Sequence, residues 1–343
     1  MNASKNVDRS PNERMFQLLS GYWITRAIHV AAELDIAEHL KGGPQSYEAL
    51  AAATETDPSS LYRLLRALAS VGIFAEVEEK RFELTPLAAT LLKDTPNSLR
   101  GNAIMQSYEI YWQSWGELAS SVKTGEPVFN RLFGADFFSY LSQTPEFSKR
   151  FNEGMAAITA QSDGAIVTAY DFSGISTIVD VGGGTGELLA AILKAAPHSR
   201  GILLDQPATV EQAKGIFRES SLLERCTFVE GSFFDAVPSG GNVYILKNIL
   251  HDWSDEQAIN ILQQCRKVIG NGQKLLIMET VIPSGNEPFL GKLIDLQLML
   301  FFKGGRERTA AEFGILLEAA NFSLARVIPT FTPRVAIVEA IAK

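Results

Sequence analysis

The chain has 343 residues, of which 46% are hydrophobic and 20% are charged, so its composition is that of a globular protein large enough for two domains. Its formal net charge of −8 disfavours a nucleic-acid partner, because that affinity comes largely from Lys and Arg side chains that neutralise phosphates. The polar N-terminus lacks the apolar segment of a secretory signal, and no apolar run reaches the ~18–20 residues that span a bilayer, so we expect a cytoplasmic protein with no membrane partner.

The first predicted element is an apolar helical segment over residues 13–34. Its pattern places five side chains on or near one face: Phe16, Leu19, Trp23, Ala27 and Val30. This apolar surface is larger than a small N-terminal domain needs for its own core. We therefore predict a homodimer that is built mainly through this segment.

A compact motif follows this segment. The predicted order is helix, turn, helix and hairpin, at residues 47–53, 57–58, 61–71, and 74–77 with 81–84. That order resembles a winged helix, which invites a DNA-binding interpretation, and the second helix does carry Arg63 and Arg66. However, Glu76, Glu78 and Glu79 occupy the wing, where a DNA-binding protein carries cations. The sequence therefore favours a dimerisation or lid module.

From residue 174 onward, short apolar strands alternate with helices. The expected strands are residues 176–181, 201–206, 226–234, 242–250 and 274–282, and the expected helices are residues 187–197, 209–220, 254–270 and 308–322. Such alternation predicts an α/β fold with a parallel sheet whose faces are both covered. Two last strands, at 324–330 and 334–342, are separated only by a short turn around Pro333, so they must be antiparallel.

A glycine-rich loop, DVGGGTG, follows the first of these strands and opens a helix. Gly182 and Gly184 leave room for a ligand near the positive end of that helix. The dinucleotide fingerprint requires a third glycine where this chain has Glu187, and Glu187 and Asp180 would repel a pyrophosphate. This disfavours an oxidoreductase and favours a cofactor that has a sulfonium and no phosphates.

Asp205 closes the next strand. A carboxylate at that position can accept both hydroxyls of a ribose. The alternative role for Asp205 is to cap the helix that follows. Because the glycine loop and this acid occur together, we predict the ribose role.

The segment VYILKNILHDWSDEQ ends an apolar strand at His251. One interpretation is a surface histidine beside acids that cap a helix. Ser254 and Gln257 have the spacing of a capping box, so we assign Asp252 and Asp255 mainly structural roles. His251 then lies at the carboxyl end of a parallel strand, where open α/β sheets bind ligands.

These motifs together resemble the S-adenosylmethionine-dependent small-molecule O-methyltransferases, the family of caffeic acid and acetylserotonin O-methyltransferases. The likeness covers nearly the whole chain and rests on IVDVGGGTG, LKNILHDWSDE and GGRERT in family order. It implies a class I methyltransferase fold, a Rossmann-like doubly wound sheet with an antiparallel C-terminal hairpin. It also implies a winged-helix dimerisation domain over residues 1–100, a helical linker over 101–172 that contributes to the acceptor pocket, and a catalytic domain over 173–343.

The resemblance also assigns residues to S-adenosyl-L-methionine. The implied cofactor-binding residues are Asp180, Gly182, Gly184, Asp205, Gln206, Ser232, Phe233 and Lys247. Plant members have Asp-Met where this chain has Ser232 and Phe233, so the carboxylate that stands beside the adenine in those members is absent here, although Phe233 can still stack on the base. For Lys247, the alternative is a lysine at a strand end that extends into solvent.

His251 matches the general base of the family, and Glu279 and Glu307 match the two carboxylates that flank it. The resemblance places nine residues around a small, phenolic or otherwise aromatic acceptor: Met105, Tyr108, Trp112, Phe151, Met155, Trp253, Leu298, Met299 and Phe302. For each of these, ordinary core packing is an equally good explanation. Plant relatives have Asn in place of Phe302 and Trp in place of Asn248, which argues against a phenylpropanoid acceptor.

The sequence leaves other functions open. A non-catalytic regulator that binds the cofactor is disfavoured by the complete set of His251, Glu279 and Glu307, while N- or C-methylation is not excluded. No His, Asp or Cys cluster has metal-ligand spacing, and the only cysteines, Cys226 and Cys265, make neither a disulfide scaffold nor a thiolate zinc site. We therefore expect a reaction that needs no metal.

Overall fold

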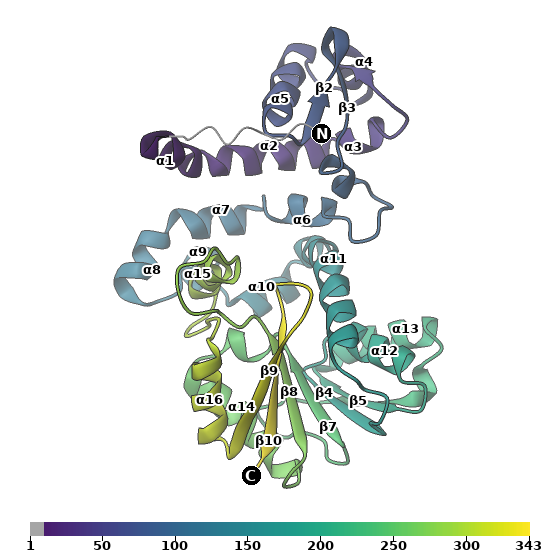
Figure 1. Cartoon of the computed structure of the whole chain (residues 1–343), viewed down its shortest axis with the longest axis vertical. Helices are drawn as coiled ribbons and strands as arrows, with labels where there is room; N and C mark the ends of the chain where they lie inside the picture. Colours follow the sequence, from purple (N-terminus) through teal and green to yellow (C-terminus); the bar gives the residue numbers. More distant parts are fainter. Residues whose placement is uncertain (1–9) are drawn as a thin grey trace. The chain divides into compact units, whose positions relative to one another are not determined.

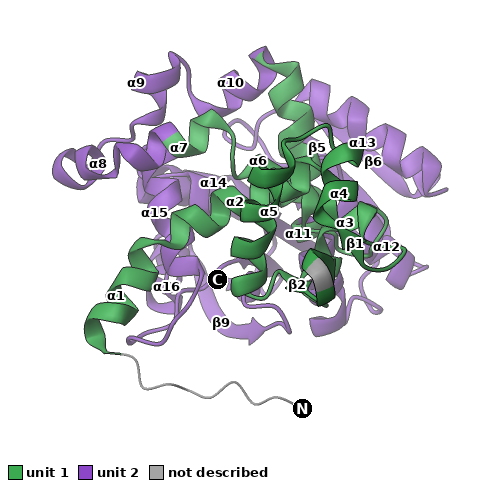
Figure 2. Ribbon diagram, turned by 90° about the horizontal axis from the view of Figure 1, so that it is seen from above, with its two compact units in different colours: residues 1–112, 144–158 green, residues 113–143, 159–343 purple. Residues whose placement is uncertain are grey.

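The computed structural model describes residues 10–343, apart from the side chain of Glu79. It divides the chain into two compact units (Figure 2). Unit 1 comprises the described residues up to Trp112 together with Thr144–Ile158, and unit 2 comprises Gln113–Gln143 and Thr159–Lys343. The segment 101–172, predicted as a separate linker, is shared by both units, because the long helix α11 (Pro145–Ala169) begins in unit 1 and ends in unit 2.

Unit 1 begins with two helices where the sequence predicted one apolar segment. Helix α1 (Pro11–Leu19) ends at Ser20, and α2 (Gly21–Glu33) starts directly after it. The short α3 (Ile36–His39) leads to the predicted motif. Six large apolar side chains on α1 and α2 are more than half exposed: Met15, Phe16, Leu18, Leu19, Tyr22 and Trp23.

The predicted helices and hairpin of unit 1 are all present. A small core is surrounded by helix α4 (Tyr47–Ala53) and by strands β1 (Gln45–Ser46), β2 (Phe74–Glu76) and β3 (Arg81–Leu84). The three strands pair in the order β1-β3-β2. Helix α5 (Pro58–Ser70) starts three residues earlier than predicted, because Asp57 caps it by accepting the Ser60 N–H. The winged-helix interpretation of this motif stays a prediction.

The remaining short helices lie on either side of the division between the units. Helix α6 (Arg100–Met105) belongs to unit 1, and α7 (Glu109–Gly116) crosses into unit 2. Unit 2 then adds α8 (Leu118–Thr124), α9 (Phe129–Phe133) and α10 (Phe137–Gln143), and later α15 (Gly291–Phe301). Rings from α9, α10 and α15 pack together, with Phe129 and Phe137 both against Phe301.

A seven-stranded sheet forms the centre of unit 2, in the order β6-β5-β4-β7-β8-β10-β9 (Figure 1). Five of these strands are parallel to one another: β4 (Thr177–Val181), β5 (Arg200–Asp205), β6 (Cys226–Glu230), β7 (Val243–Lys247) and β8 (Lys274–Glu279). The last two, β9 (Phe322–Pro329) and β10 (Ala336–Ala342), form the predicted antiparallel hairpin, and β10 pairs with β8. The predicted fold class is therefore confirmed.

Helices cover both faces of this sheet. Figure 1 shows α12 (Glu187–Ala195) and α13 (Pro207–Glu219) on one face, and α14 (Asp255–Val268) and α16 (Ala310–Ala319) on the other. Successive residues of β7 alternate between two cores: Ile245 packs with the α12 side, whereas Tyr244 and Leu246 pack with the α14 side. Burial on both faces explains why the parallel strands are continuously apolar.

Between residues 10 and 343, no helix combines the length and the apolar character needed to cross a bilayer. The cytoplasmic location inferred from the sequence stays a prediction. Cys226 and Cys265 are free thiols, and Cys265 belongs to the buried core of unit 2.

Candidate active site

The proposed site lies where the strand order of the sheet reverses. The chain proceeds from β4 outward through β5 and β6, and then returns to place β7 on the other side of β4. The loops at the carboxyl ends of β4 and β7 diverge at such a point, which makes it the usual ligand site of open α/β sheets. The glycine loop follows β4, Asp205 ends β5, and Lys247 ends β7.

The glycines of the loop have positive φ angles of 71° at Gly182 and 59° at Gly184, where other residues are strained. The free space around the Cα atom differs between Gly182 and Gly184. A Cβ at Gly182 would lie 2.7 Å from the Ile249 side chain and 3.1 Å from the Phe233 ring, so this glycine is needed for packing. A Cβ at Gly184 would meet no atom within 4 Å, so the room for a ligand lies there.

A cavity of about 160 Å³ opens beside the loop. It brings together the predicted Asp180, Gly182, Gly184 and Lys247, and it also includes Thr159, which sequence reasoning missed. The full lining is Thr159, Asp180, Gly182, Gly183, Gly184, Thr185, Glu187, Leu188, Lys247 and Asn248. The Oδ1 atom of Asp180 is buried and has no hydrogen-bond partner among the described residues.

Asp205 is already engaged with the glycine loop. Its Oδ2 accepts the Gly184 N–H at 2.8 Å, and its Oδ1 accepts the Gln206 N–H at 2.7 Å. The residue at the N-cap of α13 is Gln206, so Asp205 is not the cap that the alternative interpretation required. Gln206 itself donates through Nε2 to the Gly231 carbonyl at 3.4 Å.

Ser232 and Phe233 lie in a turn after β6, which ends at Glu230 rather than at residue 234 as predicted. The Ser232 hydroxyl accepts the Phe234 N–H at 3.2 Å, so it stabilises this turn. The Phe233 ring lies against Gly182 and makes an edge contact with Trp253, with centroids 6.3 Å apart. An aromatic wall beside the glycine loop is therefore present, without the carboxylate of the plant relatives.

Lys247 does not extend into solvent. Its ammonium forms an ion pair with Asp163 of α11, and the two side chains are 12% and 5% exposed. Burial raises the pKa of Asp163, and Lys247 opposes that rise. Burial is also the main reason that the pKa of Asp180 rises to about 7. Sequence reasoning missed Asp163; the only signal was a single acid among small and apolar residues late in α11.

His251 lies in a 3-10 turn, Leu250–Asp252, just beyond β7. Glu279, at the end of β8, was expected to flank the imidazole, but its Oε1 instead accepts three backbone N–H groups of this turn. The distances are 3.1 Å from Ile249, 2.5 Å from Leu250 and 3.3 Å from His251. The carboxylate thus fixes the backbone that carries His251, which is a different role from orienting the ring.

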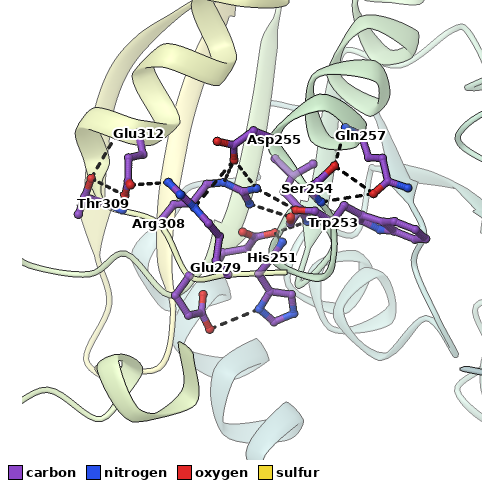
Figure 3. A network of polar contacts seen from close by, with 12 residues as sticks. His251, Trp253, Ser254, Asp255, Gln257, Glu279, Arg308, Thr309 and Glu312 are labelled. Atoms are coloured by element: carbon purple, nitrogen blue, oxygen red, sulfur yellow. Dashed lines mark hydrogen bonds and ion pairs between the residues drawn. The ribbon is translucent and has the colours of Figure 1, made fainter. Parts of the chain in front are cut away.

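Arg308 holds the carbonyl side of the same turn. Its side chain is completely buried and donates to the carbonyls of Leu250 at 2.7 Å and Trp253 at 2.9 Å. It also contacts Asp255 at 2.8 Å (Figure 3). The predicted capping box is confirmed, because the Ser254 hydroxyl accepts the Gln257 N–H and the Gln257 side chain accepts the Ser254 N–H. Sequence reasoning missed Arg308, although it lies next to Glu307 in the GGRERT motif.

The imidazole of His251 lies between two carboxylates. Its Nδ1 is 3.4 Å from Glu307 Oε1, and its Nε2 is 3.5 Å from Asp252 Oδ1. The contact with Glu307 was predicted, whereas Asp252 was expected to be mainly structural. Burial alone would lower the pKa of His251, but Asp252, Glu307 and Glu279 outweigh burial and raise it to about 10.

The predicted acceptor residues are distributed over both units. Met105, Tyr108, Trp112, Phe151 and Met155 belong to unit 1, and Trp253, Leu298, Met299 and Phe302 belong to unit 2. Within unit 1, Tyr108 packs on Phe147, which packs on Phe151. Within unit 2, Phe302 lies against Phe137 and Phe138. Their roles toward an acceptor stay predictions.

The described residues include no group of three or more His, Cys, Asp or Glu side chains that could hold a metal ion. The independence of the reaction from metals stays a prediction.

Comparison with known families gives two matches. The O-methyltransferase domain matches residues 115–323, and the O-methyltransferase dimerisation domain matches residues 16–94.

Several characterised relatives match over most of the chain. Phenazine O-methyltransferase PhzM of Lysobacter antibioticus is 46% identical, covering 92% of each chain. Mitomycin biosynthesis 6-O-methyltransferase of Streptomyces lavendulae is 37% identical over 95% of this chain and 93% of that one. Phenazine-1-carboxylate N-methyltransferase of Pseudomonas aeruginosa is 32% identical over 94% of this chain and 95% of that one.

Solved structures agree with these relatives. The crystal structure of LaPhzM has a TM-score of 0.87 and 44% identity, covering 97% of this chain and 99% of that one. The structure of NcsB1, an O-methyltransferase from neocarzinostatin biosynthesis, contains S-adenosylmethionine and 2-hydroxy-5-methyl naphthoic acid. It has a TM-score of 0.78 and 33% identity, covering 93% of this chain and 96% of that one.

Proposed function

Because the chain belongs to the S-adenosylmethionine-dependent O-methyltransferase family of secondary-metabolite enzymes, we propose that it methylates a hydroxyl group of a small aromatic metabolite with His251 as the general base. The observation that carries this proposal is the position of His251. The histidine follows the strand next to the glycine loop, its backbone is held by Glu279 and Arg308, and its ring contacts Glu307.

The cavity beside the glycine loop fits the cofactor. Its lining includes Asp180, Glu187 and Lys247, and Asp205 is bound to the same loop, so acids predominate, which suits a cationic cofactor. The unpartnered Oδ1 of Asp180 offers a hydrogen-bond acceptor there. We assign the methionine part of the cofactor to the loop around Gly182 and Gly184, the ribose to Asp205 with Gln206 beside it, and the adenine side to Ser232 and Phe233.

The chain's own residues then supply proton transfer and positioning. When bound, the cofactor would supply a methyl group on a sulfonium, so that an acceptor oxygen could bond to the methyl carbon as the carbon–sulfur bond breaks and the neutral thioether leaves. A phenol has an ordinary pKa of about 10 and is mostly protonated at neutral pH, so its proton must be removed as the oxygen reacts. Glu307 at Nδ1 favours the tautomer whose Nε2 can accept that proton. Asp252 near Nε2 then stabilises the imidazolium.

The acceptor class follows from the relatives and from the aromatic side chains. The relatives' names specify phenazine and mitomycin, and NcsB1 was solved with a hydroxylated naphthoic acid. Planar rings pack well on Trp253, Met299 and Phe302, which we propose as acceptor contacts in unit 2. The test is methyl transfer from isotopically labelled cofactor to a panel of hydroxylated phenazines, naphthoates and quinols, with each product identified by mass spectrometry. Methylation of no hydroxyl in the panel, together with methylation at nitrogen or carbon, would contradict the proposal.

N-methylation is the second candidate, because two relatives, each 32% identical to this chain, are named as an N,N-dimethyltransferase and an N-methyltransferase. An unprotonated ring nitrogen carries its own lone pair and needs no base. The presence of His251 between Glu307 and Asp252 therefore favours the O-methylation proposal. A nitrogen acceptor whose turnover does not depend on His251 would support the alternative.

The pH dependence should report the charge on His251. Only neutral imidazole can accept a proton, and a pKa of about 10 leaves roughly a thousandth of the enzyme in that form at pH 7. We therefore expect kcat/KM to rise about tenfold per pH unit above neutrality and to level near pH 10. Asp252→Asn removes a neighbouring negative charge, so its profile should shift to lower pH by about 1–3 units.

Two acceptors of different hydroxyl pKa provide the control for this pH profile. If ionisation of His251 controls the rate, kcat/KM rises over the same pH range for both acceptors. A rise that moves with the acceptor, and is unchanged in Asp252→Asn, would show that ionisation of the acceptor controls the rate.

Asp205→Ala should weaken cofactor binding by about 1.5–3 kcal/mol, the scale for a lost charge-assisted hydrogen bond. The variant loses the proposed ribose contact as well as the bond to the Gly184 N–H. Calorimetric titration with S-adenosylmethionine measures the change. Glu211→Ala, an exposed acid on α13 outside the cavity, is the matched control, and unchanged affinity in Asp205→Ala would remove Asp205 from the site.

We also propose that the enzyme is a homodimer formed through α1 and α2. The dimerisation-domain match covers residues 16–94, and the six exposed apolar side chains of these helices form a surface that monomers rarely expose. Light scattering at micromolar concentration should give about twice the chain mass. The double variant Leu18→Glu, Trp23→Glu should be monomeric or should aggregate. Wild-type protein that is monomeric would refute the proposal.

A further inference from the structure

A buried carboxylate that the proposed mechanism does not use lies beside the cofactor cavity. Asp163 is 4% exposed, and its Oδ1 pairs with the Lys247 ammonium. Its Oδ2 is buried without a hydrogen-bond partner among residues 10–343. Lys247 lines the cavity beside the glycine loop. The pair therefore puts one positive charge at the cavity and the negative charge that compensates it next to that lysine.

The acids of this region interact electrostatically with the pair. The pKa of Asp180 is raised mainly by burial, is lowered by Lys247, and is raised further by Asp163, Asp205 and Glu187. The pKa of Asp163 is likewise raised by burial, lowered by Lys247 and raised by Glu187. Lys247 thus lowers the pKa of both Asp163 and Asp180. Without the charge of Asp163, Lys247 would lose its ion-pair partner, and the cavity would become more positive.

The cofactor and its demethylated product make this charge measurable. S-adenosylmethionine and S-adenosylhomocysteine share the adenosine, the carboxylate and the α-ammonium, and they differ by one methyl group and one positive charge at sulfur. The ratio of their dissociation constants therefore isolates the interaction with the sulfonium, because changes in fold or cavity shape affect both ligands.

We propose that Asp163 is a specificity-determining residue of the cofactor site, which neutralises Lys247 and so preserves affinity for the cationic cofactor relative to its neutral-sulfur product. The proposal rests on the assignment of the glycine-loop cavity to the cofactor. It gives the Asp163–Lys247 pair a role in turnover, because a neutralised Lys247 does not oppose the attraction between the other acids of the cavity and the sulfonium, and that attraction is lost when the sulfonium charge disappears during transfer.

The test is calorimetric titration of the full-length protein with each of the two compounds at about pH 7, where ordinary carboxylates are ionised and the α-amino group of each compound is mostly protonated. Asp163→Asn keeps the shape but leaves Lys247 without a negative partner. Its affinity for S-adenosylmethionine should fall about four- to sixteenfold more than its affinity for S-adenosylhomocysteine, the scale for one unit charge acting across about 10 Å at an effective dielectric constant of about 20–40. The charge-balanced double variant, Asp163→Asn with Lys247→Met, should restore the wild-type ratio.

Two further variants keep the test decisive. Lys247→Met alone should move the ratio the opposite way from Asp163→Asn, and this holds even if Asp163→Asn does not fold. Asp171→Asn is the matched control, because Asp171 is an exposed acid that accepts the Ser173 N–H in the following turn. We expect it to leave both affinities unchanged.

The proposal would be overturned by a ratio that stays constant in all variants while both affinities fall together. That result would show that the pair only ties α11 to β7. Failure of the cavity assignment looks different, because Asp205→Ala would then leave the binding of both compounds unchanged. If Asp205→Ala weakens both and Asp163→Asn leaves their ratio intact, only the role of Asp163 is wrong.

Discussion

Replacing His251 with Gln should lower turnover on a hydroxyl acceptor by about 10²–10⁴-fold, the usual contribution of a general base. Glutamine keeps much of the volume and can still form a hydrogen bond, but it has no basic nitrogen. Affinity for S-adenosylmethionine should barely change, because His251 does not line the cavity beside the glycine loop. Steady-state kinetics and calorimetry on the same preparation measure both quantities.

The matched control is His198→Gln, at an exposed histidine outside the site, which should retain wild-type turnover. The acceptor must have a hydroxyl pKa well above the pH of the assay, since an oxygen that is already ionised needs no base. Near-normal turnover of His251→Gln on such an acceptor would return His251 to the role of a surface histidine beside a capped helix.

Features that depend on neighbouring residues could be predicted from the sequence. The capping box of Ser254 and Gln257 spans four positions, and the C-terminal hairpin follows from two strands around Pro333. The loop around Gly182 was found because strand, glycines and helix are contiguous. In each case the residues that determine the structure are close together in the chain.

The missed contacts depend on distant parts of the chain. Asp163 and Lys247 are 84 positions apart, so their ion pair depends on how α11 packs against the sheet. Glu279 reaches the His251 turn because β7 and β8 pair in parallel, with Lys247 beside Met278. The sequence indicated that Glu279 is near His251. Only the register of β7 and β8 determines that Glu279 accepts the backbone N–H groups of the turn.

Replacing Arg308 with Met should destabilise the protein by about 2–5 kcal/mol and lower turnover at temperatures where the variant is still folded. The guanidinium is completely buried and satisfies the carbonyls of Leu250 and Trp253, on either side of His251. Each buried carbonyl left without a donor costs about 1–3 kcal/mol. Urea denaturation gives the free energy of unfolding, and kinetics on the folded variant give the effect on the turn.

Asp255→Asn separates the carbonyl contacts from the ion pair. Asp255 is half exposed, and solvent screens its attraction for Arg308, so this variant should lose at most about 1 kcal/mol. Arg308→Lys keeps the charge but not the planar fork that reaches both carbonyls, so its stability should lie between that of Arg308→Met and wild type. If Arg308 positions His251, then folded Arg308→Met should bind S-adenosylmethionine normally while kcat falls and the pH profile shifts. An unchanged kcat and pH profile in that variant would limit Arg308 to stabilising the fold.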